Sequence, residues 1–270
     1  MVPELKIKAI IDLIDKREPF EAIDDLRCFH LKIERYTPMI AAAIHDGHHL
    51  PEDRSNQCAL SDAERLYEED PYTKSFIQHC PIVFSGLDSR YYYDLNRMPS
   101  EAIYDTAWGK SVWTIPLSDE QKTAALNRYT RCYTVIHHLM HSLVQQFSDR
   151  PILVFDIHSY NYKRWEREVP EINVGTSKVD RTVWGAFIER YLNLLSHSFD
   201  TFWVAENNTF FGKGAFLQQL MSQHENCLVL ATEFKKYFCD ELTAEVYLEK
   251  VEETAHKLQK VIDKMLISEL

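Results

Sequence analysis

The sequence predicts an α/β protein with a mixed, largely parallel sheet flanked by helices. Apolar runs of strand length alternate along the chain with amphipathic segments of helix length. The run at 152–157 includes Leu153, Phe155 and Ile157 and is apolar on both faces, as is typical of a parallel strand covered by helices. Only 7 glycines and 10 prolines are present, too few for a long flexible linker. We therefore expect residues 1–270 to form one domain.

The first third of the chain predicts a helix, a strand and a second helix. Residues 4–16 have amphipathic helical periodicity. The stretch "LKIERYTPMIAAAIHDGHHL" changes from charged to apolar and then breaks at Gly47, which indicates a strand followed by a loop. Ser61 with Glu64 three residues later is a capping box, so a helix should begin there and be interrupted or restarted near Pro71.

The remaining elements continue the alternation. Aromatic and polar residues alternate in "DSRYYYDLNR", which predicts a strand leading into a long loop that carries Trp108 and Trp113. The later segments predict helices at 119–148, 180–198 and 241–268, and strands at 152–157, "TFWVAENN" and "CLVLATEF".

Charge and cysteine content limit the possible partners and the cellular location. The net charge of −11 argues against a nucleic-acid partner, because phosphate binding draws on clusters of Lys and Arg. The N-terminal segment carries charges throughout and predicts neither a signal peptide nor a membrane span. Six scattered cysteines form no CxxC pair, which favours a reduced cytoplasmic protein over a disulfide set or a cysteine-ligated zinc. No membrane partner is expected, and the sequence does not indicate the oligomeric state.

Three predicted strands run into ionisable residues, His45, His158 and Glu233. Because the carboxyl ends of parallel strands meet at one edge of a sheet, these side chains should lie close together. Two imidazoles and a carboxylate are typical of a mononuclear zinc hydrolase, with a second carboxylate as base. The carboxylate ligand would be Glu69 or Asp70. The alternatives are an ordinary hydrogen-bonded His158 and a solvated acidic helix start.

Basic residues in an acidic, aromatic stretch suggest recognition of an anion. Arg90 and Arg97 flank "YYYDLN", and Asn96 precedes Arg97. A guanidinium pairs with a carboxylate in bidentate fashion and an amide adds a hydrogen bond, so the pair predicts a carboxylate site. The alternative is a salt bridge to Asp88 or Asp94.

Other candidate residues carry weaker signals. His48 and His49 either line the site or are solvated loop residues. His137 and His141 have the i, i+4 spacing of metal ligands but no glutamate between them, so we interpret them as ordinary helix residues. Asp156 should support the end of the strand that carries His158, and Ser159 lacks the glycine-rich elbow of a nucleophile.

Seven short motifs occur in a characteristic order along about residues 44 to 234: "IHDGHHLP", "EEDPYT", "DSRYYYDLNR", "VFDIHSYN", "INVGT", "FFGKGAF" and "LATEF". This order resembles the N-formylglutamate amidohydrolase family. The family is itself similar to the zinc carboxypeptidases, so the resemblance implies a zinc-carboxypeptidase-like (phosphorylase/hydrolase-like) fold. Two departures, Asp46 after the first histidine and Lys213 in the glycine-rich segment, bear on the substrate more than on the reaction.

The resemblance implies a role for each matching residue. It places one Zn²⁺ per chain on His45, Asp70 and His158, with Glu69 as the competing ligand, and it makes Glu233 the general base. The remaining implied roles are the substrate α-carboxylate for Asn96 and Arg97, the scissile carbonyl or a second carboxylate for Arg90, substrate binding for Asn173 and Thr176, and ligand orientation for His138.

The function that follows is a metal-dependent amidohydrolase. Its expected substrate is an N-acyl amino acid with a free carboxylate, similar to N-formylglutamate. One alternative is a metallopeptidase or tailoring hydrolase whose pocket is widened by the aromatic loop at 100–116. Another is a non-catalytic binding homologue, against which the presence of every implied ligand, the base and the carboxylate pair argues.

Overall fold

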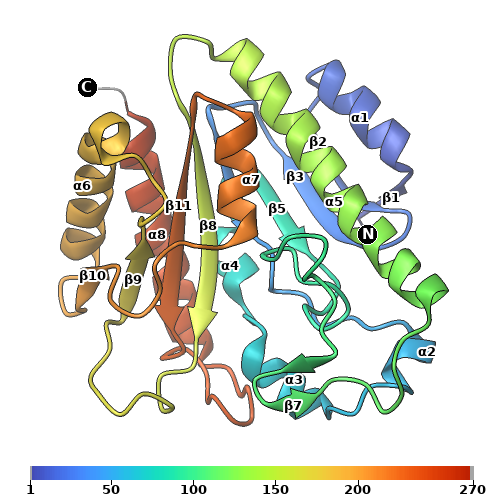
Figure 1. The fold of residues 1–270 in the computed structure, drawn as a ribbon. Helices are drawn as coiled ribbons and strands as arrows, with labels where there is room; N and C mark the ends of the chain where they lie inside the picture. Colours follow the sequence, from blue (N-terminus) through green and yellow to red (C-terminus); the bar gives the residue numbers. More distant parts are fainter. Residues whose placement is uncertain (1, 268–270) are drawn as a thin grey trace.

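A nine-stranded sheet forms the centre of the molecule (Figure 1). The computed structural model describes residues 2–267. The strands lie in the order β1-β2-β3-β5-β4-β8-β11-β9-β10. Their bounds are β1 Glu4–Leu5, β2 Phe20–Asp24, β3 Phe29–Ile33, β4 Met39–Ala43, β5 Ile82–Gly86, β8 Ile152–Tyr160, β9 Ile172–Gly175, β10 Val204–Glu206 and β11 Cys227–Lys235. A separate hairpin joins β6 (Thr106–Ala107) and β7 (Lys110–Ser111).

The sheet is mixed and largely parallel, as predicted. The pairs β1–β2, β5–β4, β4–β8, β8–β11 and β9–β10 run parallel. The pairs β2–β3, β3–β5 and β11–β9 run antiparallel. The α/β class is therefore confirmed.

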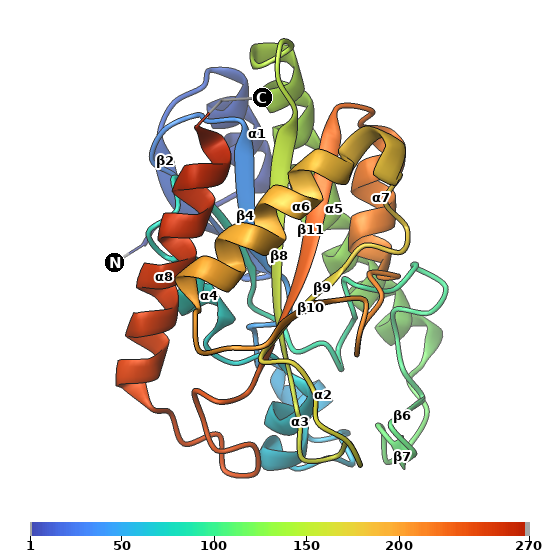
Figure 2. The same cartoon turned by 90° about the vertical axis from the view of Figure 1, so that its left-hand side faces the viewer.

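Helices cover both faces of the sheet. Figures 1 and 2 show α1, α5 and α7 on one face and α4, α6 and α8 on the other, with α2 and α3 at the edge where β8 ends. Their bounds are α1 Ile7–Asp15, α2 Glu52–Ser55, α3 Asp62–Glu68, α4 Thr73–Ile77, α5 Asp119–Gln146, α6 Arg181–Ser198, α7 Ala215–Gln223 and α8 Leu248–Leu266. Within residues 2–267, no helix has both the length and the apolar character needed to cross a membrane.

The central strands explain why the site forms at one edge. Every residue of β8 is buried, because helices cover both sides of this strand. β4, β8 and β11 run parallel, so their carboxyl ends reach the same edge. His45 follows β4 by two residues, while His158 and Glu233 lie directly opposite each other in β8 and β11. The predicted convergence of these three positions is confirmed.

The capping box at Ser61 is also confirmed. Its hydroxyl accepts a hydrogen bond from the Glu64 backbone N–H, and the Glu64 carboxylate accepts one from the Ser61 N–H. The helix ends at Glu68, and α4 begins two residues after Pro71. The two acidic residues Glu69 and Asp70 therefore lie between two helices. The Glu69 N–H still donates to the Arg65 carbonyl, as in a helix, whereas the Asp70 N–H donates to the His45 carbonyl.

Two predicted elements are wrong in part. The segment 88–97 contains no strand; the strand is β5, just before it. Asp94 accepts hydrogen bonds from the backbone N–H of Asn96 and from Arg90, so local polar contacts fold this segment into turns. Glu4 and Leu5 form β1 rather than the first turn of a helix, because they pair with β2.

The last helix begins later than predicted. It starts at Leu248 rather than at 241, and residue 268 lies outside the described residues. Asp240 accepts hydrogen bonds from the backbone N–H groups of Leu242 and Thr243, which closes a turn there. The antiparallel strands β2, β3 and β9 and the helix α7 were not predicted, since their short runs carry little periodicity.

Candidate active site

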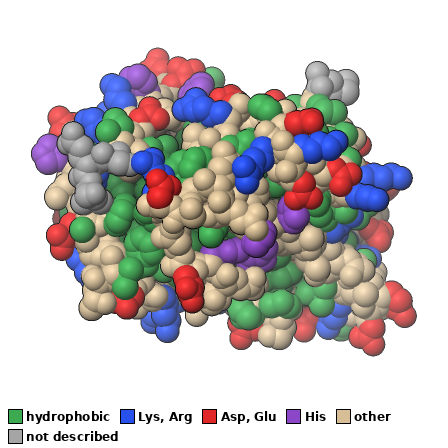
Figure 3. Space-filling model, turned by 90° about the horizontal axis from the view of Figure 1, so that it is seen from above, with side chains coloured by type: hydrophobic (Ala, Val, Ile, Leu, Met, Phe, Trp, Pro, Cys, Tyr) green, Lys and Arg blue, Asp and Glu red, His purple; other side chains and the backbone are tan. Residues whose placement is uncertain are grey.

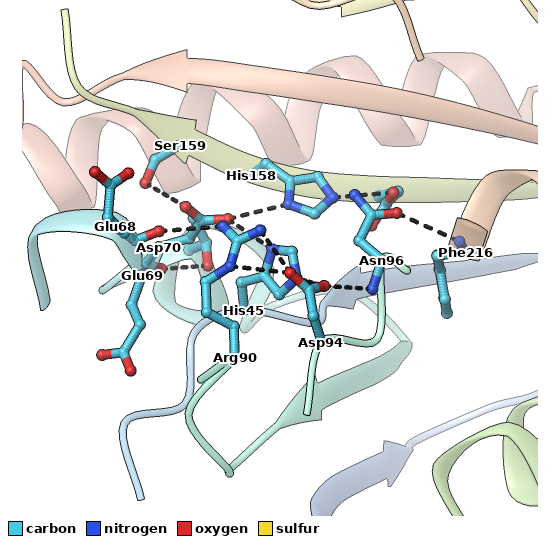
Figure 4. A network of polar contacts seen from close by, with 12 residues as sticks. His45, Glu68, Glu69, Asp70, Arg90, Asp94, Asn96, His158, Ser159 and Phe216 are labelled. Carbon is cyan, nitrogen blue, oxygen red and sulfur yellow. Dashed lines mark hydrogen bonds and ion pairs between the residues drawn. The ribbon is translucent and has the colours of Figure 1, made fainter. Parts of the chain in front are cut away.

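A cavity of about 410 Å³ opens at the carboxyl edge of the central strands. It contains five of the predicted charged site residues together: His45, Asp70, Arg90, His158 and Glu233. Asn96 and Arg97 line it as well. Figure 4 shows where the labelled side chains come from. His45 and His158 lie at the ends of β4 and β8, Asp70 lies in the connection after α3, and Arg90 and Asn96 lie in the segment after β5.

His45, Asp70 and His158 form a compact, buried set. His158 Nδ1 lies 3.0 Å from Asp70 Oδ2, and His45 Nδ1 lies 3.4 Å from the same oxygen. Each residue offers one ligand atom, and these atoms all lie within 4.8 Å of one another. None of the three residues is more than 3% exposed, so their donor atoms are shielded from bulk water.

A second carboxylate lies beside the far nitrogen of each imidazole. His45 Nε2 lies 2.8 Å from Asp94 Oδ1. His158 Nε2 lies 3.0 Å from Asp156 Oδ2, without hydrogen-bond geometry. Such partners on the far ring nitrogen are typical of metal-binding histidines, because they fix the tautomer that leaves the near nitrogen free. Asp156 thus lies beside His158, as the sequence suggested, but forms no hydrogen bond with the ring.

The set fits a divalent cation. Two ligand atoms about 2.1 Å from a tetrahedral zinc lie about 3.4 Å apart, close to the separations found here. His45 Nδ1 is buried and has no hydrogen-bond partner among residues 2–267. An unpaired buried nitrogen aimed at a carboxylate is expected where a cation binds. The arrangement of one oxygen and two nitrogens is therefore a candidate metal site.

The charges within the set stabilise one another. Burial alone would raise the pKa of Asp70, but its contacts with His158 and His45 outweigh burial and hold the pKa below its ordinary value. Burial would lower the pKa of His158, yet Asp156 and Asp70 raise it well above the ordinary value. A cation between Asp70 and the imidazoles would replace the proton that now balances this charge.

Glu69 lies outside the set. Its carboxylate accepts hydrogen bonds from Ser89 and contacts His48 Nδ1, and its side chain extends away from Asp70 (Figure 4). Ser159 lines the cavity, and its hydroxyl donates to Asp70 Oδ1 over 3.4 Å. Ser159 therefore orients the Asp70 carboxylate.

Glu233 projects beside the set. Its register partner in β8 is His158, and both residues line the cavity. Burial raises the pKa of Glu233 to about 8, with further upward contributions from Asp70 and Asp156 and opposing ones from His158 and Arg90. A carboxyl group in this position can hold a proton that ordinary glutamates release.

Arg90 is bound on several sides. Its Nη2 lies 2.8 Å from Asp94 Oδ2, so the salt bridge considered from the sequence exists. Its Nη1 donates to the Glu68 carbonyl over 3.1 Å, and its guanidinium lies 5.1 Å from the centre of the Trp108 ring. Both Arg90 and Trp108 line the cavity, and Trp108 belongs to the aromatic loop at 100–116.

Asn96 has a fixed orientation. Its Oδ1 accepts a hydrogen bond from the Phe216 backbone N–H over 3.3 Å, and its carbonyl accepts one from Ala215 (Figure 4). The amide NH₂ of Asn96 is therefore free to donate into the cavity. The same contacts place the N-terminus of α7 at the cavity wall, where its dipole favours an anion.

Two cations lie near this helix terminus. Arg97 is exposed, and its Nε donates to the Tyr104 hydroxyl over 3.4 Å. Lys213 lines the cavity one residue before Gly214, with its ammonium 5.4 Å from the centre of the Phe211 ring. Neither forms a salt bridge within the described part of the chain. Both charges are available to a ligand.

Asn173 and Thr176 do not line the cavity. Asn173 Oδ1 accepts hydrogen bonds from the backbone N–H groups of Asn208 and Thr209. Thr176 donates to Glu206 and accepts from Asn207. These two side chains hold the segment 206–210, whose residues Thr209 and Phe210 line the cavity.

The other histidines lie away from the cavity. His49 contacts Asp88 at 2.8 Å, His138 contacts Asp15 at 2.7 Å, and His141 Nε2 lies 2.8 Å from Gln145. His137 Nδ1 and His224 Nε2 lie 3.2 Å apart. His137 lies within α5 and His224 follows the last residue of α7. Histidine side chains gather on the face seen from above in Figure 3.

Comparison with known proteins identifies relatives of this fold. A family model described as N-formylglutamate amidohydrolase matches residues 37–238. The structure of N-formylglutamate amidohydrolase from Ralstonia eutropha JMP134 has a TM-score of 0.71 and 16% identity, covering 88% of this chain and 98% of its own. The gene product Atu2144 from Agrobacterium tumefaciens has the same TM-score and identity, covering 88% and 94%.

A metallo-carboxypeptidase from Burkholderia cenocepacia matches with a TM-score of 0.39 and 10% identity, covering 87% of this chain and 61% of its own, a likeness too low to carry an argument. No curated protein matches the sequence.

The contact of Asn96 with α7 can be tested through Gly214. A Cβ atom at this position would lie 1.9 Å from Asn96 Oδ1. We expect Gly214→Ala to destabilise the protein by about 1–3 kcal/mol, the usual cost of overpacking. Gly185→Ala in α6 is the control, because its Cβ meets nothing within 4 Å; it should stabilise the protein by about 0.5–1 kcal/mol. Urea denaturation measures both, and equal stability of the two variants would contradict the contact.

Proposed function

Because the chain belongs to the N-formylglutamate amidohydrolase family, we propose that it is a metal-dependent hydrolase that cleaves the amide of an N-acyl amino acid with a free carboxylate. The observation that carries the proposal is the buried set of His45, Asp70 and His158, with Glu233 paired to His158 across adjacent strands. A cation site with a carboxyl group beside it suits attack of water on a carbonyl.

The ligand set supports zinc. Two imidazoles and one carboxylate leave a further coordination position open, as catalytic zinc sites do. When bound, the ion would supply a Lewis acid that polarises a carbonyl and acidifies water. His45, Asp70 and His158 would hold it, with Asp94 orienting His45 and Asp156 lying beside His158.

The other roles in the proposed reaction belong to side chains and to one helix terminus. Glu233 would accept the proton of the attacking water and pass it to the leaving amine. Arg90, held in place by Asp94, would stabilise negative charge on the carbonyl oxygen. Asn96, Arg97 and the N-terminus of α7 would bind the substrate carboxylate, which fixes the direction of the substrate in the cavity.

Other sequence predictions are proposals of the same kind. We propose one zinc ion per chain, one domain over residues 1–270, and a cytoplasmic location. The six free cysteines are consistent with a reducing compartment. Asn173 and Thr176 would act on substrate binding through the segment 206–210 that they hold.

Metal content tests the proposed ligands. We expect about one zinc per chain in the purified protein and none in His158→Ala, because a structural or catalytic zinc needs three protein ligands. Elemental analysis of dialysed protein is the measurement. His137→Ala removes a histidine outside the cavity and should retain the metal. A wild-type protein that takes up no divalent metal would contradict the site.

The role of Glu233 predicts a separation between metal binding and turnover. Glu233→Gln keeps the shape of the side chain but cannot accept the proton, so turnover of N-formylglutamate should fall by about a hundredfold or more, with the metal content unchanged. Glu171→Gln is the matched control, because Glu171 binds Lys235 outside the cavity. Full activity of Glu233→Gln would remove this residue from the mechanism.

The role of Asp94 predicts a loss of metal affinity. Asp94→Asn weakens the acceptor for His45 Nε2, so we expect divalent metal affinity to fall about 10–100-fold. Tyr104→Phe removes another hydrogen bond to the same carboxylate without touching His45, and it should keep the affinity. Competition with a chromophoric chelator gives both dissociation constants. Equal losses in the two variants would argue against a specific role for the contact with His45.

A further inference from the structure

The cavity extends beyond the site of the proposed reaction. In Figure 4, Glu68 and Ser159 lie on one side of Asp70 and His158, and Asn96 lies on the other. Asn161 donates a hydrogen bond to the Tyr67 carbonyl, next to Glu68. A formyl group contains one carbon and would leave the Glu68 side of the cavity without a ligand.

This side is walled by a neutral polar surface. Arg164 Nη2 lies 2.6 Å from Glu68 Oε1, so the two charges offset each other. The Trp165 ring packs edge-on against Phe210 with centroids 6.2 Å apart. Both aromatic residues line the cavity, as do Asn161 and Thr209.

Three buried polar atoms on this wall have no partner within residues 2–267: Asn161 Oδ1, Trp165 Nε1 and Thr209 Oγ1. Asn161 is only 4% exposed and Thr209 only 7%, so bulk water does not satisfy them. Buried polar atoms are nearly always hydrogen-bonded to protein, ordered water or a ligand, so a substrate group at this end of the cavity can supply the missing partners.

The unpaired atoms define the chemistry of that partner. The Trp165 indole N–H can only donate. Asn161 Oδ1 can only accept, and the bond from Nδ2 to Tyr67 keeps this oxygen from exchanging places with the nitrogen. The Thr209 hydroxyl can do either. A carboxylate would meet the Asn161 oxygen, and an ammonium would meet the indole N–H, so neither ion suits the wall.

A secondary amide has the complementary pair, one carbonyl acceptor and one N–H donor. Resting on the proposed hydrolase function, we infer that Asn161, Trp165 and Thr209 form a subsite for a second amide group in the acyl part of the substrate. The substrate class is then an N-acylaminoacyl amino acid, that is, a short peptide-like chain whose free carboxylate lies at the Asn96 end. Trp165 donates to the carbonyl of this amide, and Asn161 accepts from its N–H.

Three glutamate derivatives with acyl chains of equal length test this assignment. N-acetylglycyl-glutamate carries the full second amide, levulinoyl-glutamate keeps only its carbonyl, and pentanoyl-glutamate has neither group. Binding is measured by calorimetry on zinc-loaded Glu233→Gln, which does not need to turn over. We expect affinity to fall about tenfold at each step, the amount that one neutral hydrogen bond accounts for.

Trp165→Phe, built on the Glu233→Gln background, removes only the indole donor. It should erase the difference between the levulinoyl and pentanoyl compounds and keep the difference between the acetylglycyl and levulinoyl compounds. Trp108→Phe is the matched control, because Trp108 lines the cavity on the Arg90 side and is 44% exposed; it should keep both differences.

The outcomes separate the two proposals. Equal affinity for the three compounds, or full discrimination in Trp165→Phe, would overturn the subsite, and turnover of the compounds by the wild-type enzyme would then still support the hydrolase. Failure of the zinc-loaded wild-type enzyme to cleave any of them would count against the hydrolase, while graded binding to Glu233→Gln would still support the subsite.

Discussion

The geometry of the candidate site depends on the contacts of one carboxylate, that of Asp94. It lies 2.8 Å from His45 Nε2, it accepts from the Asn96 backbone N–H over 2.7 Å, and it binds Arg90. Burial would raise the pKa of Asp94, but Arg90 and His45 outweigh it and hold the pKa well below the ordinary value. A single buried charge therefore sets the positions of His45 as a metal-ligand candidate, of Asn96 as a candidate for binding a carboxylate, and of the Arg90 cation. It also explains why the segment after β5 folds into turns, since a strand would separate these three partners.

The sheet and α3 supply the rest of the geometry. The register of β8 and β11 places Glu233 opposite His158. Hydrogen bonds to the backbone just before Asp70 fix the position of this residue. The Lys236 ammonium donates to the Tyr67 and Glu69 carbonyls, each over 2.7 Å. Arg90 donates to the Glu68 carbonyl. Lys236 lies three residues after Glu233 on the same segment, so the element that carries the candidate base also fixes the connection that carries the candidate ligand. Unsatisfied carbonyls at a helix end are the natural acceptors for such a clamp.

The sequence predicts the positions of those site residues that directly follow a recognisable strand. His45, His158 and Glu233 each follow an apolar run, and parallel strands end at one edge, so their convergence could be predicted without any partner being known. The contact of Asp94 with His45 and the contact of Lys236 with Tyr67 could not, because the partners lie 49 and 169 residues apart in the chain and nothing near either residue marks the contact. The strands β2 and β3 were missed for a related reason: an antiparallel pair at the sheet periphery is specified by its neighbours more than by its own periodicity.

The distribution of charge within the cavity gives the substrate one direction. At the Asn96 end, Arg97 and Lys213 form no salt bridge with any carboxylate of residues 2–267, and the N-terminus of α7 adds a positive partial charge. At the other end, Arg164 is neutralised by Glu68, and the remaining polar atoms are uncharged. The proposed substrate would therefore have its carboxylate stabilised at one end alone, and its amide bond would then lie across the candidate cation site. In the proposed orientation the acyl group would lie toward Asn161 and Trp165, so the chemistry of that wall, rather than the reaction centre, would decide which acyl group is accepted.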